Sequence, residues 1–533
     1  MKILLYFLLF VTFHSFGQTN FDYTIQTKPK TIIGFEGLHS FAIAERKGKI
    51  LIIGGRLDGI HARQPFNSFP QKKNNTDIIL IDLELNSVKK TTINVLPTAL
   101  KEQLQGTNFN FYQDEDTLYI TGGYAYSETV KDHTTFPYLT SVSISKLIQA
   151  IENQTAIDSC FKQIKNEVFA VTGAQLGKIG DTFYLVGGHR FEGRYNPMDR
   201  PTFVQTYVNG IRKFKINNSG EQLSFGNYEQ WTDEFQLHRR DYNLIPHVFG
   251  PNEEFGYIIS SGVFQKNADK PYLYPIEIKS SGFEPKMNFY QYLSNYHSAH
   301  ASFYDSKNKV NHTVYFGGIS QYTFEEGKLN SDEEVPFVKT ISRLTRDING
   351  NYSEYAFDTK MPEFVGSSTD FIPVHTNVFS HHSIIDLASL DKDSNLVGYI
   401  VGGLHSTTPN PFSNDVTDLT SSSNVIYEVW LNKDKNADAQ AIDGTSKFDV
   451  KSLPIVKSKQ FLFVFIVPER GDVELFVTDK NGKIVLETFY KKVKTGKKKL
   501  QFSKEHTLPK GEYVFNFIYN EIFFDSEIIK VKD

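Results

Sequence analysis

Short apolar runs that end in a pair of glycines recur along the chain. The first is residues 50–53, Ile-Leu-Ile-Ile, followed by Gly54 and Gly55. Further copies end at the glycine pairs 122–123, 187–188, 317–318 and 402–403, and residues 256–262 form a worn copy in which Ser261 replaces the first glycine. Four successive β-formers predict a strand that is buried on both faces, and the glycines permit positive φ and close backbone approach. Six copies predict six stacked β-units.

This repeated strand and diglycine resemble the kelch β-propeller family, whose blades carry an aromatic or aliphatic run and then two glycines. The resemblance covers about residues 30–445 and implies a six-bladed propeller, although the family's later Tyr and Trp positions are mostly missing. Successive pairs lie between 56 and 85 residues apart, more than the roughly 50 residues typical of kelch blades. We expect the excess in loops, which would decorate one face.

The strands of the first unit can be placed individually. Residues 39–45, 49–53, 77–82 and 87–95 are predicted to be its four strands. Residues 21–31 alternate as one further strand, and we expect this strand to pair with residues 424–431 in the last unit. Such a closure removes a frayed edge from the ring.

One segment departs from the β-pattern. Residues 143–165 carry Ile144, Leu147, Ile148 and Ile151 at helical spacing, which predicts a helix on the outside of the second unit. The single cysteine, Cys160, falls in this insert and is expected to lie outside any blade core. One cysteine excludes an internal disulfide.

The chain changes character near residue 432. Residues 432–444 are polar and turn-rich, as in a linker, and the calcium-loop spacing of Asp434, Asn436 and Asp438 lacks the glycine and glutamate that such a loop needs. Six strand-like runs follow: 461–467, 473–477, 483–489, 499–502, 513–519 and 528–531. They predict a small immunoglobulin-like β-sandwich over residues 446–533.

Three segments of this C-terminal unit, residues 475–485, 508–514 and 528–532, resemble the sorting domains of type IX secretion cargo. A plain immunoglobulin-like module would supply the same Asn-Gly and Pro-Lys-Gly turns, so both interpretations stay open. Residues 1–17 have one positive charge, an apolar run and small residues before Gln18. This pattern predicts a secretory signal peptide, with an uncleaved anchor as the alternative. The propeller would then occupy residues 18–445.

Composition narrows the classes of function. The 533 residues include 40% hydrophobic ones, enough for large cores, and carry a formal net charge of −4. No strongly basic surface is implied, so we expect no nucleic-acid partner. The pair His297 and His300 would place its imidazoles on opposite faces of a strand, and no Cys or carboxylate set accompanies it. We therefore expect no metal site and no cofactor.

The residues just after the glycine pairs should crown one mouth of a central channel. Arg56, Tyr124, His189 and Arg190 lie there. The resemblance to kelch adaptors, which bind acidic peptides through arginines, reaches Arg56 and Arg190 directly, and His39 and Arg240 by a less secure alignment. Arginine suits this role because its planar fork binds carboxylates bidentately. The alternative is that Arg56 and Arg190 only tie loops to neighbouring blades.

These observations predict an exported, non-catalytic recognition or assembly module that binds a protein partner of the cell envelope through its loops, with carbohydrate as a further ligand. We expect it to be secreted or held at the cell surface or outer membrane, with the periplasm as the alternative, and we assign no catalytic residue. Exposed aromatic tips at Tyr124, Tyr126 and Phe191 would favour a protein partner.

A sugar-acting enzyme is the alternative function. The propeller resembles that of secreted N-acetylneuraminate epimerases in size and export, and Glu192, Arg194, His189 and Arg240 would supply the acid and base such chemistry needs. Galactose oxidase, a copper enzyme of the kelch class, crosslinks a tyrosine to a cysteine. The expected position of Cys160 does not fit that arrangement.

Overall fold

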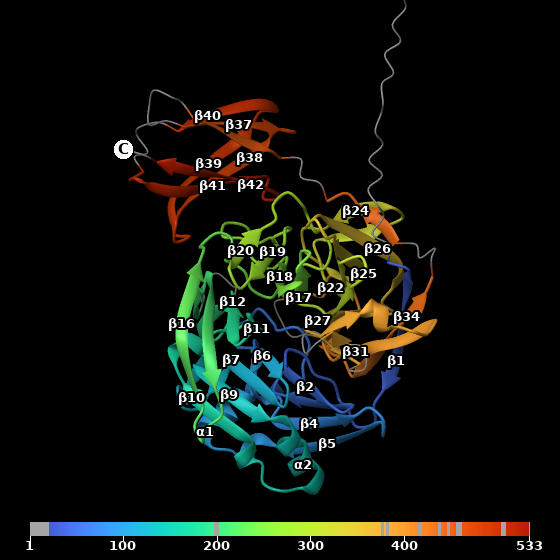
Figure 1. Cartoon of the computed structure of the whole chain (residues 1–533). Coiled ribbons are helices and arrows are strands. Elements are labelled where there is room, and N and C mark those ends of the chain that lie inside the picture. Colours follow the sequence, from blue (N-terminus) through green and yellow to red (C-terminus); the bar gives the residue numbers. More distant parts are fainter. Residues whose placement is uncertain are drawn as a thin grey trace, which may run out of the picture.

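The computed structural model describes residues 21–64, 66–196, 202–374, 378–379, 383–413, 418–434, 439–444, 448–454, 461–502 and 508–531. The segment predicted to be a signal peptide lies outside these residues. The described chain is almost entirely β-structure (Figure 1). No helix in the described part is long and apolar enough to cross a membrane.

Six groups of four antiparallel strands follow one another around a common axis, which is the arrangement of a β-propeller (Figure 1). Each group is called a sheet below, although the second and the fifth are parts of seven-stranded sheets. The first three are β2(Ala42–Arg46)–β3(Lys49–Ile53)–β4(Asp77–Asp82)–β5(Ser87–Thr92), β6(Thr107–Asp114)–β7(Thr117–Ser127)–β9(Tyr138–Ser143)–β10(Phe161–Lys165), and β11(Gln175–Ile179)–β12(Thr182–Val186)–β15(Gly210–Asn217)–β16(Ser224–Thr232). The next three are β17(Asn243–Phe249)–β18(Glu254–Ser260)–β19(Ile276–Lys279)–β20(Gly282–Pro285), β21(His300–Asp305)–β22(Val310–Ile319)–β25(Phe337–Arg346)–β26(Tyr352–Lys360), and β28(Asp370–Pro373)–β31(Ser394–Val401)–β34(Val425–Lys433)–β1(Tyr23–Thr31).

The glycine pairs follow the buried run of the second strand of each sheet, as the repeat predicts, and in β7 and β22 the strand continues through them. In the first sheet Ile50, Leu51, Ile52 and Ile53 are fully buried, because neighbouring sheets cover both faces of β3. The five true pairs all have positive φ, and the worn copy keeps the same conformation, with φ of 58° at Ser261 and 104° at Gly262. The worn copy is therefore structurally equivalent to the other five.

A ring of hydrogen bonds joins the six sheets at the glycine-pair end of the channel. Its members lie at the starts of the first strands, Asn108 as the second residue of β6 and the others two or three residues ahead of the strand: Ser40, Asn108, Gly173, Asp241, His297 and Ser368. Five links are backbone N–H groups that donate to the carbonyl of the preceding sheet at 2.9–3.4 Å, with Ser40 donating to Ser368. The remaining link is the Thr172 hydroxyl, which donates to the Asn108 carbonyl at 2.8 Å. We call these six residues the closing ring.

The N-terminal strand completes the sixth sheet. β1 pairs antiparallel with β34 over nine residues, from Tyr23 opposite Lys433 to Thr31 opposite Val425. This confirms the predicted pairing of residues 21–31 with residues 424–431. The two ends of the propeller are thus joined by main-chain hydrogen bonds.

The helical insert is shorter than predicted. α2(Ile144–Asn153) is helical, but residues 161–165 form β10, the outer strand of the second sheet. The apolar side of α2 packs into a core shared by the first and second sheets, where it lies between them rather than outside one. Cys160 is buried in that same core, contrary to its predicted position. A shorter helix, α1(Thr98–Leu104), covers the same region.

The extra residues of the long repeats form small sheets on the glycine-pair face. β7 continues past its glycines and pairs with β8(Asp132–Thr135), which connects to β13(His189–Gly193) and β14(Phe203–Tyr207). Further accessory strands on this face are β23(Tyr322–Glu325), β24(Lys328–Ser331), β27(Phe364–Ser367), β32(Leu404–Ser406) and β33(Thr420–Ser422). β29(Val378–Phe379) and β30(Ile384–Asp386) lie in the connection between β28 and β31 instead, where β30 pairs parallel with β21 and extends the fifth sheet. The predicted decoration of one face is present.

The C-terminal residues form two sheets over one core. One is β36(Val450–Pro454)–β37(Phe461–Val467)–β40(Gly496–Phe502), and the other is β39(Ile484–Val493)–β38(Gly471–Asp479)–β41(Gly511–Tyr519)–β42(Phe523–Val531). Phe463, Phe515 and Phe517 are fully buried between them. β36 was not predicted. The expected linker contributes a strand, β35(Ala439–Ile442), to the edge of β26, and residues 435–438 of the calcium-like spacing lie outside the described part.

The C-terminal unit docks on the propeller through an aromatic interface. Phe476, Ile518 and Phe524 join a core that includes Tyr272, Tyr274 and Tyr290 of the propeller. The Tyr290 hydroxyl accepts a hydrogen bond from the Phe524 amide at 2.6 Å and donates to its carbonyl at 3.1 Å. A fully buried amide pair, Gln236 and Asn516, adds a bond of 3.2 Å. The unit is therefore an integral part of this fold.

Candidate functional site

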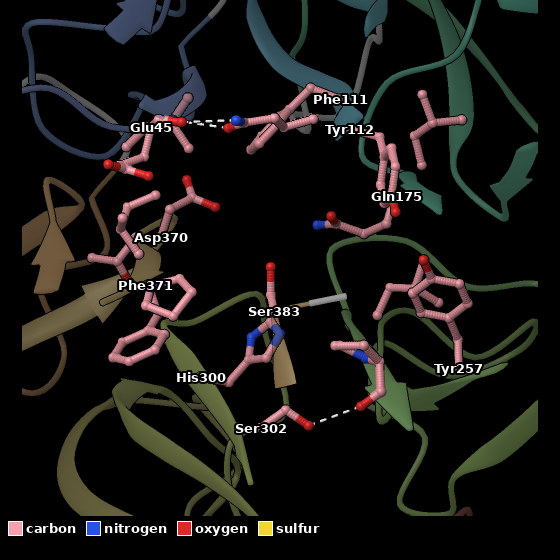
Figure 2. Close-up of a pocket in the computed structure, with 18 of the residues that line it drawn as sticks. Glu45, Phe111, Tyr112, Gln175, Tyr257, His300, Ser302, Asp370, Phe371 and Ser383 are labelled. Atoms are coloured by element: carbon pink, nitrogen blue, oxygen red, sulfur yellow. Dashed lines mark hydrogen bonds between the residues drawn. The ribbon is translucent and has the colours of Figure 1, made fainter. Parts of the chain in front are cut away.

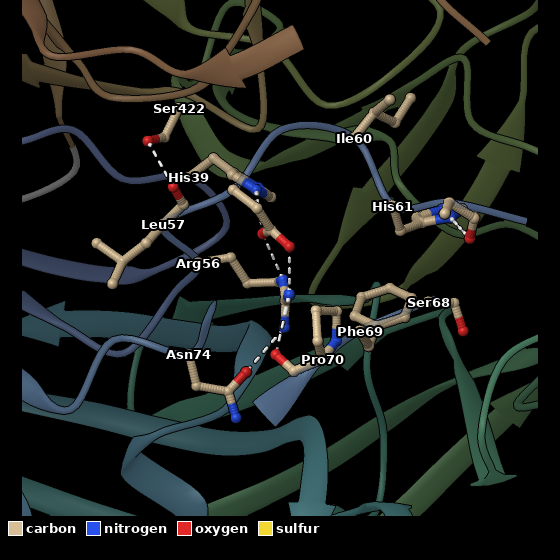
Figure 3. A network of polar contacts seen from close by, with 12 residues as sticks. His39, Arg56, Leu57, Ile60, His61, Ser68, Phe69, Pro70, Asn74 and Ser422 are labelled. Atoms are coloured by element: carbon tan, nitrogen blue, oxygen red, sulfur yellow. Dashed lines mark hydrogen bonds and ion pairs between the residues drawn. The ribbon is translucent and has the colours of Figure 1, made fainter. Parts of the chain in front are cut away.

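Arg56, predicted to bind an acidic peptide, already holds a carboxylate of its own chain (Figure 3). Its side chain is 3% exposed, its Nε donates to Asp58 at 2.8 Å, and its Nη1 donates to the amide oxygen of Asn74 at 2.8 Å. Burial would raise the pKa of Asp58, but the His39 ring at 3.8 Å and the hydrogen-bonded Arg56 guanidinium outweigh it and lower this pKa to about 2. Arg56 thus ties its loop to the first sheet, which is the alternative that the sequence left open, and binding of a peptide by this residue stays a prediction.

The other predicted site residues are also engaged within the protein. Tyr124 is buried, and its hydroxyl donates to the Gly193 carbonyl at 2.8 Å. His189 is buried against Gln205, with 2.8 Å between its Nδ1 and the amide nitrogen. Arg240 pairs with Asp241 at 2.9 Å and donates to the Tyr207 hydroxyl at 3.1 Å. These contacts stabilise the glycine-pair face.

The expected exposed tips are not exposed. Phe191 is buried beside Tyr124, with 5.8 Å between their ring centroids, and Tyr126 is half-buried. Only Arg190 of the predicted arginines reaches the surface, where its 37% exposed side chain pairs with Glu167 at 2.8 Å and Glu192 at 2.7 Å. The predicted ring of free arginines does not form.

Replacing Arg56 is expected to have a large effect on stability and replacing Arg190 a small one. Arg56→Ala would leave Asp58 without its guanidinium partner in a buried site, which should lower the free energy of unfolding by about 3 kcal/mol. Arg190→Ala removes an exposed pair and should change it by less than about 1 kcal/mol. Urea unfolding of both variants measures the difference. Equal, small effects would show that Arg56 is not structural.

A cavity of about 940 Å³ runs along the propeller axis (Figure 2). At one end it meets closing-ring residue His297 and its neighbour Thr369. At the other end it reaches Lys47 and Glu115, which are exposed residues in the turns after the first strands. The cavity therefore opens on the face opposite the glycine pairs, away from the loops that the sequence singled out.

The first strands line the cavity in layers. The residues three places after each closing-ring residue are Ile43, Phe111, Leu176, Leu244, His300 and Phe371, and all six line the cavity. Five are apolar, so this layer is a hydrophobic collar with one imidazole. Two places further along lie Glu45, Gln113, Pro246, Ser302 and Pro373, a more polar layer nearer the opening. The Gln113 side chain bonds the main chain of Glu45: its amide nitrogen donates to the Glu45 carbonyl at 2.7 Å, and its amide oxygen accepts from the Glu45 N–H at 2.8 Å.

Asp370, Gln175 and His300 point into the cavity around the collar (Figure 2). Asp370 is half-buried, and the structure gives its carboxylate no hydrogen bond or ion pair with any described residue. Burial raises its pKa to about 7. The Nδ1 of His300 donates to the Ser298 carbonyl at 3.0 Å, which leaves Nε2 as an acceptor. Burial lowers the pKa of His300, so the neutral ring is favoured near neutral pH.

His297 and His300 were expected to face opposite ways, and that expectation is wrong. β21 begins only at His300, whereas His297 lies ahead of the strand in the closing ring, so the alternation of a strand does not apply to the pair. Both line the cavity. Burial, and to a smaller extent His300, lowers the pKa of His297 to about 4.

Acidic and basic side chains are distributed unevenly along the cavity. Glu45 and Asp370 lie along its wall, whereas the basic lining residues, Arg46 and Lys47, are at the opening. Arg46 pairs there with Asp116 at 3.1 Å. The described part of the chain has no group of three or more His, Cys, Asp or Glu side chains placed to hold a metal ion. The cavity wall offers mainly hydrogen-bond acceptors and negative charge.

No family model matches this chain, and no curated protein matches it. Among solved structures the chain is similar to one described as the structure of YjhT. The two share 9% sequence identity over 76% of this chain and 98% of that chain, with a TM-score of 0.41. A similarity this distant says nothing about what this chain binds.

Proposed function

We propose that this chain is an exported, non-catalytic recognition module, built on a six-bladed kelch-type propeller over residues 18–445 and a β-sandwich domain over residues 446–533. Its recognition site is the axial cavity, which takes a small hydroxyl-rich ligand of carbohydrate size. One observation carries this proposal: the cavity combines a hydrophobic collar with polar side chains that point into it. Small-molecule sites are concave, mostly apolar and furnished with a few polar groups.

The size and chemistry of the wall favour carbohydrate over other small molecules. The volume of about 940 Å³ lies at the upper end of the range for small-molecule sites, enough for a short oligosaccharide. Phe111 and Phe371 supply flat apolar surfaces, while Gln175, Asp370 and His300 supply hydrogen-bonding groups at the same level. A sugar ring presents the matching combination of C–H faces and hydroxyl edges.

Filling the cavity is expected to abolish binding. Gln175→Trp would place an indole inside the collar, whereas Gln230→Trp adds the same indole on the exposed outer strand β16. Calorimetric titration with a panel of trisaccharides should show binding to the parent chain and to Gln230→Trp only. Unchanged affinity in Gln175→Trp would contradict the proposal that the ligand enters the cavity.

Recognition of an envelope protein through the glycine-pair face is a second candidate. Phe66 and Val204 are 68% and 61% exposed on that face. Arg194, which lies between β13 and β14, joins this segment to the loop between β3 and β4, where it donates to the carbonyls of Ser68 at 2.7 Å and Phe66 at 3.0 Å. Affinity capture from solubilised envelope should recover a stoichiometric partner that Phe66→Asp with Val204→Asp loses. Retention of that partner by the double variant would exclude this face.

A sugar-acting enzyme is the remaining alternative, and the groups suited to its chemistry are in the cavity, not among the residues predicted from the sequence. Glu192, Arg194, His189 and Arg240, the residues predicted for it, do not line the cavity. Asp370 and His300 do, and a carboxyl with a pKa of about 7 together with a neutral imidazole in the same cavity is suited to proton transfer. Time-resolved NMR of the bound sugar separates the two functions, because a binding module leaves the sugar unchanged.

Export, the type IX route and an outer-membrane or surface location remain proposals. In the segment that resembles sorting domains, the Asp479 carboxylate accepts from the amides of Asn481 at 2.8 Å and Lys483 at 3.0 Å. The Tyr513 hydroxyl donates to the Pro509 carbonyl at 3.0 Å. These contacts give the motif residues a structural role in the domain, which a plain immunoglobulin-like module would share.

A further inference from the structure

We propose that the axial cavity selects ligands that carry an amino group over ligands that carry a carboxylate, and that Asp370 is the residue that makes this distinction. The inference rests on the proposed function, because it names the class of ligand for the same cavity. An amino sugar or a short amino-sugar oligomer has the required chemistry. An acidic sugar does not.

The first argument is the balance of hydrogen-bonding groups inside the cavity. The Asp370 carboxylate can only accept when it is ionised, and the hydrogen bond from His300 to the Ser298 carbonyl leaves His300 with an accepting Nε2. Gln175 can donate or accept. Two acceptors that face the cavity call for a ligand rich in donors, and an ammonium group brings three.

The second argument is charge, taken sheet by sheet. The charged and imidazole side chains among the described lining residues come from four sheets. They are Glu45, Arg46 and Lys47 of the first sheet, Glu115 and Asp116 of the second, His297 and His300 of the fifth, and Asp370 of the sixth. The described lining residues of the third and fourth sheets include none with a charged or imidazole side chain. Arg46 and Lys47 are at the opening, and Arg46 is paired with Asp116. Among the described lining residues no Lys or Arg side chain lies in the collar, so a carboxylate ligand there would meet Asp370 without compensation from these residues, whereas an ammonium ligand would gain an ion pair out of bulk water.

This arrangement makes binding depend on pH in one direction. A bound ammonium favours the ionised form of Asp370, whose carboxyl in the empty cavity has a pKa of about 7. For an alkylammonium, which stays protonated throughout this range, affinity should therefore be highest above pH 7 and decline as the pH falls through that value. The lowered pKa values of His297 and His300 keep their rings from adding positive charge over most of this range.

Three matched probes test the selectivity: the trimers of glucosamine, glucose and galacturonic acid. At pH 7.5 the parent chain should bind them in that order of decreasing affinity. Asp370→Asn should weaken the glucosamine trimer about tenfold more than it weakens the glucose trimer, because only the amine loses a charged hydrogen bond. Glu84→Gln, which removes an exposed carboxylate between β4 and β5, controls for net charge and should change neither affinity.

The outcomes separate this inference from the proposed function. Tightest binding of the galacturonic acid trimer, or an unchanged glucosamine affinity in Asp370→Asn, overturns the inference and leaves a carbohydrate-binding cavity in place. Failure of all three trimers to bind overturns the proposed function as well. Should Asp370→Asn fold poorly, the pH profile of the parent chain decides with the aminoethyl glycoside of the glucose trimer, whose primary ammonium stays charged up to pH 8. Affinity for this ligand that does not fall between pH 8 and pH 6 contradicts the role of Asp370.

Discussion

Removal of residues 446–533 is expected to destabilise the propeller by several kcal/mol and to cause the truncated chain to associate. The truncation would expose Tyr272, Tyr274 and Tyr290, all of which are fully buried in the intact chain. Burial of one large aromatic side chain stabilises a fold by about 1.5–3 kcal/mol, and a contiguous apolar patch promotes association. Thermal unfolding and size-exclusion chromatography of the truncated chain measure both effects.

Single substitutions on β42 sharpen this test. Phe524 is 1% exposed within the interface, and Ile528 on the same strand is 63% exposed. Phe524→Ala should therefore cost about 3 kcal/mol, and Ile528→Ala less than about 0.5 kcal/mol. A truncated chain that stays monomeric with an unchanged unfolding temperature would show that the unit is a detachable appendage, as a removable sorting domain would be.

Adding a methyl group at Gly122 is expected to be among the most damaging single changes in the chain. Gly122 has a φ of 65°, and a Cβ there would lie 1.7 Å from the Val171 carbonyl oxygen of the next sheet. That oxygen is held in place because it accepts a hydrogen bond from the Asn110 amide at 2.8 Å. Neither backbone can move without opening the contact between the second and third sheets, so Gly122→Ala should cost about 4 kcal/mol or more.

Gly180 provides the matched control. Its φ is 61°, but nothing lies within 4 Å of the position of an added Cβ. Gly180→Ala should cost only about 1 kcal/mol, the strain of a left-handed alanine. Urea unfolding of both variants isolates the steric part of the effect. Equal losses would mean that the glycine pairs are needed for their backbone conformation alone and not for the close approach of the sheets.

The architecture was predictable because its signal is repeated. Six copies of one strand and turn report on six equivalent environments, and even Ser261 could be aligned by its neighbours before the structure showed its positive φ. Where a segment occurs once, local patterns mislead. Residues 161–165 continue the apolar spacing of α2, yet pairing with β9 makes them a strand, since the second sheet needs an outer strand and tertiary pairing outweighs local propensity.

The candidate site was much less predictable. Position after a glycine pair identified Arg56, but the sequence does not show that the loop turns Asp58 and Asn74 back onto it. Asp370 and Gln175 belong to no sequence motif. They face the same cavity only because the closing ring fixes where each first strand begins along the channel axis. Counting from the ring residues would have found the collar, yet those residues differ in type from sheet to sheet and carry no shared sequence signal.

The most direct test of the central claim is a crystal structure of the protein grown with the trisaccharide that binds it most tightly. The account predicts ligand density inside the axial cavity, against Phe111 and Phe371 and within hydrogen-bonding distance of Asp370. Ligand density on the glycine-pair face, with an empty cavity, would contradict it. In that case recognition would belong to the loops around Phe66 and Val204, as first expected from the sequence.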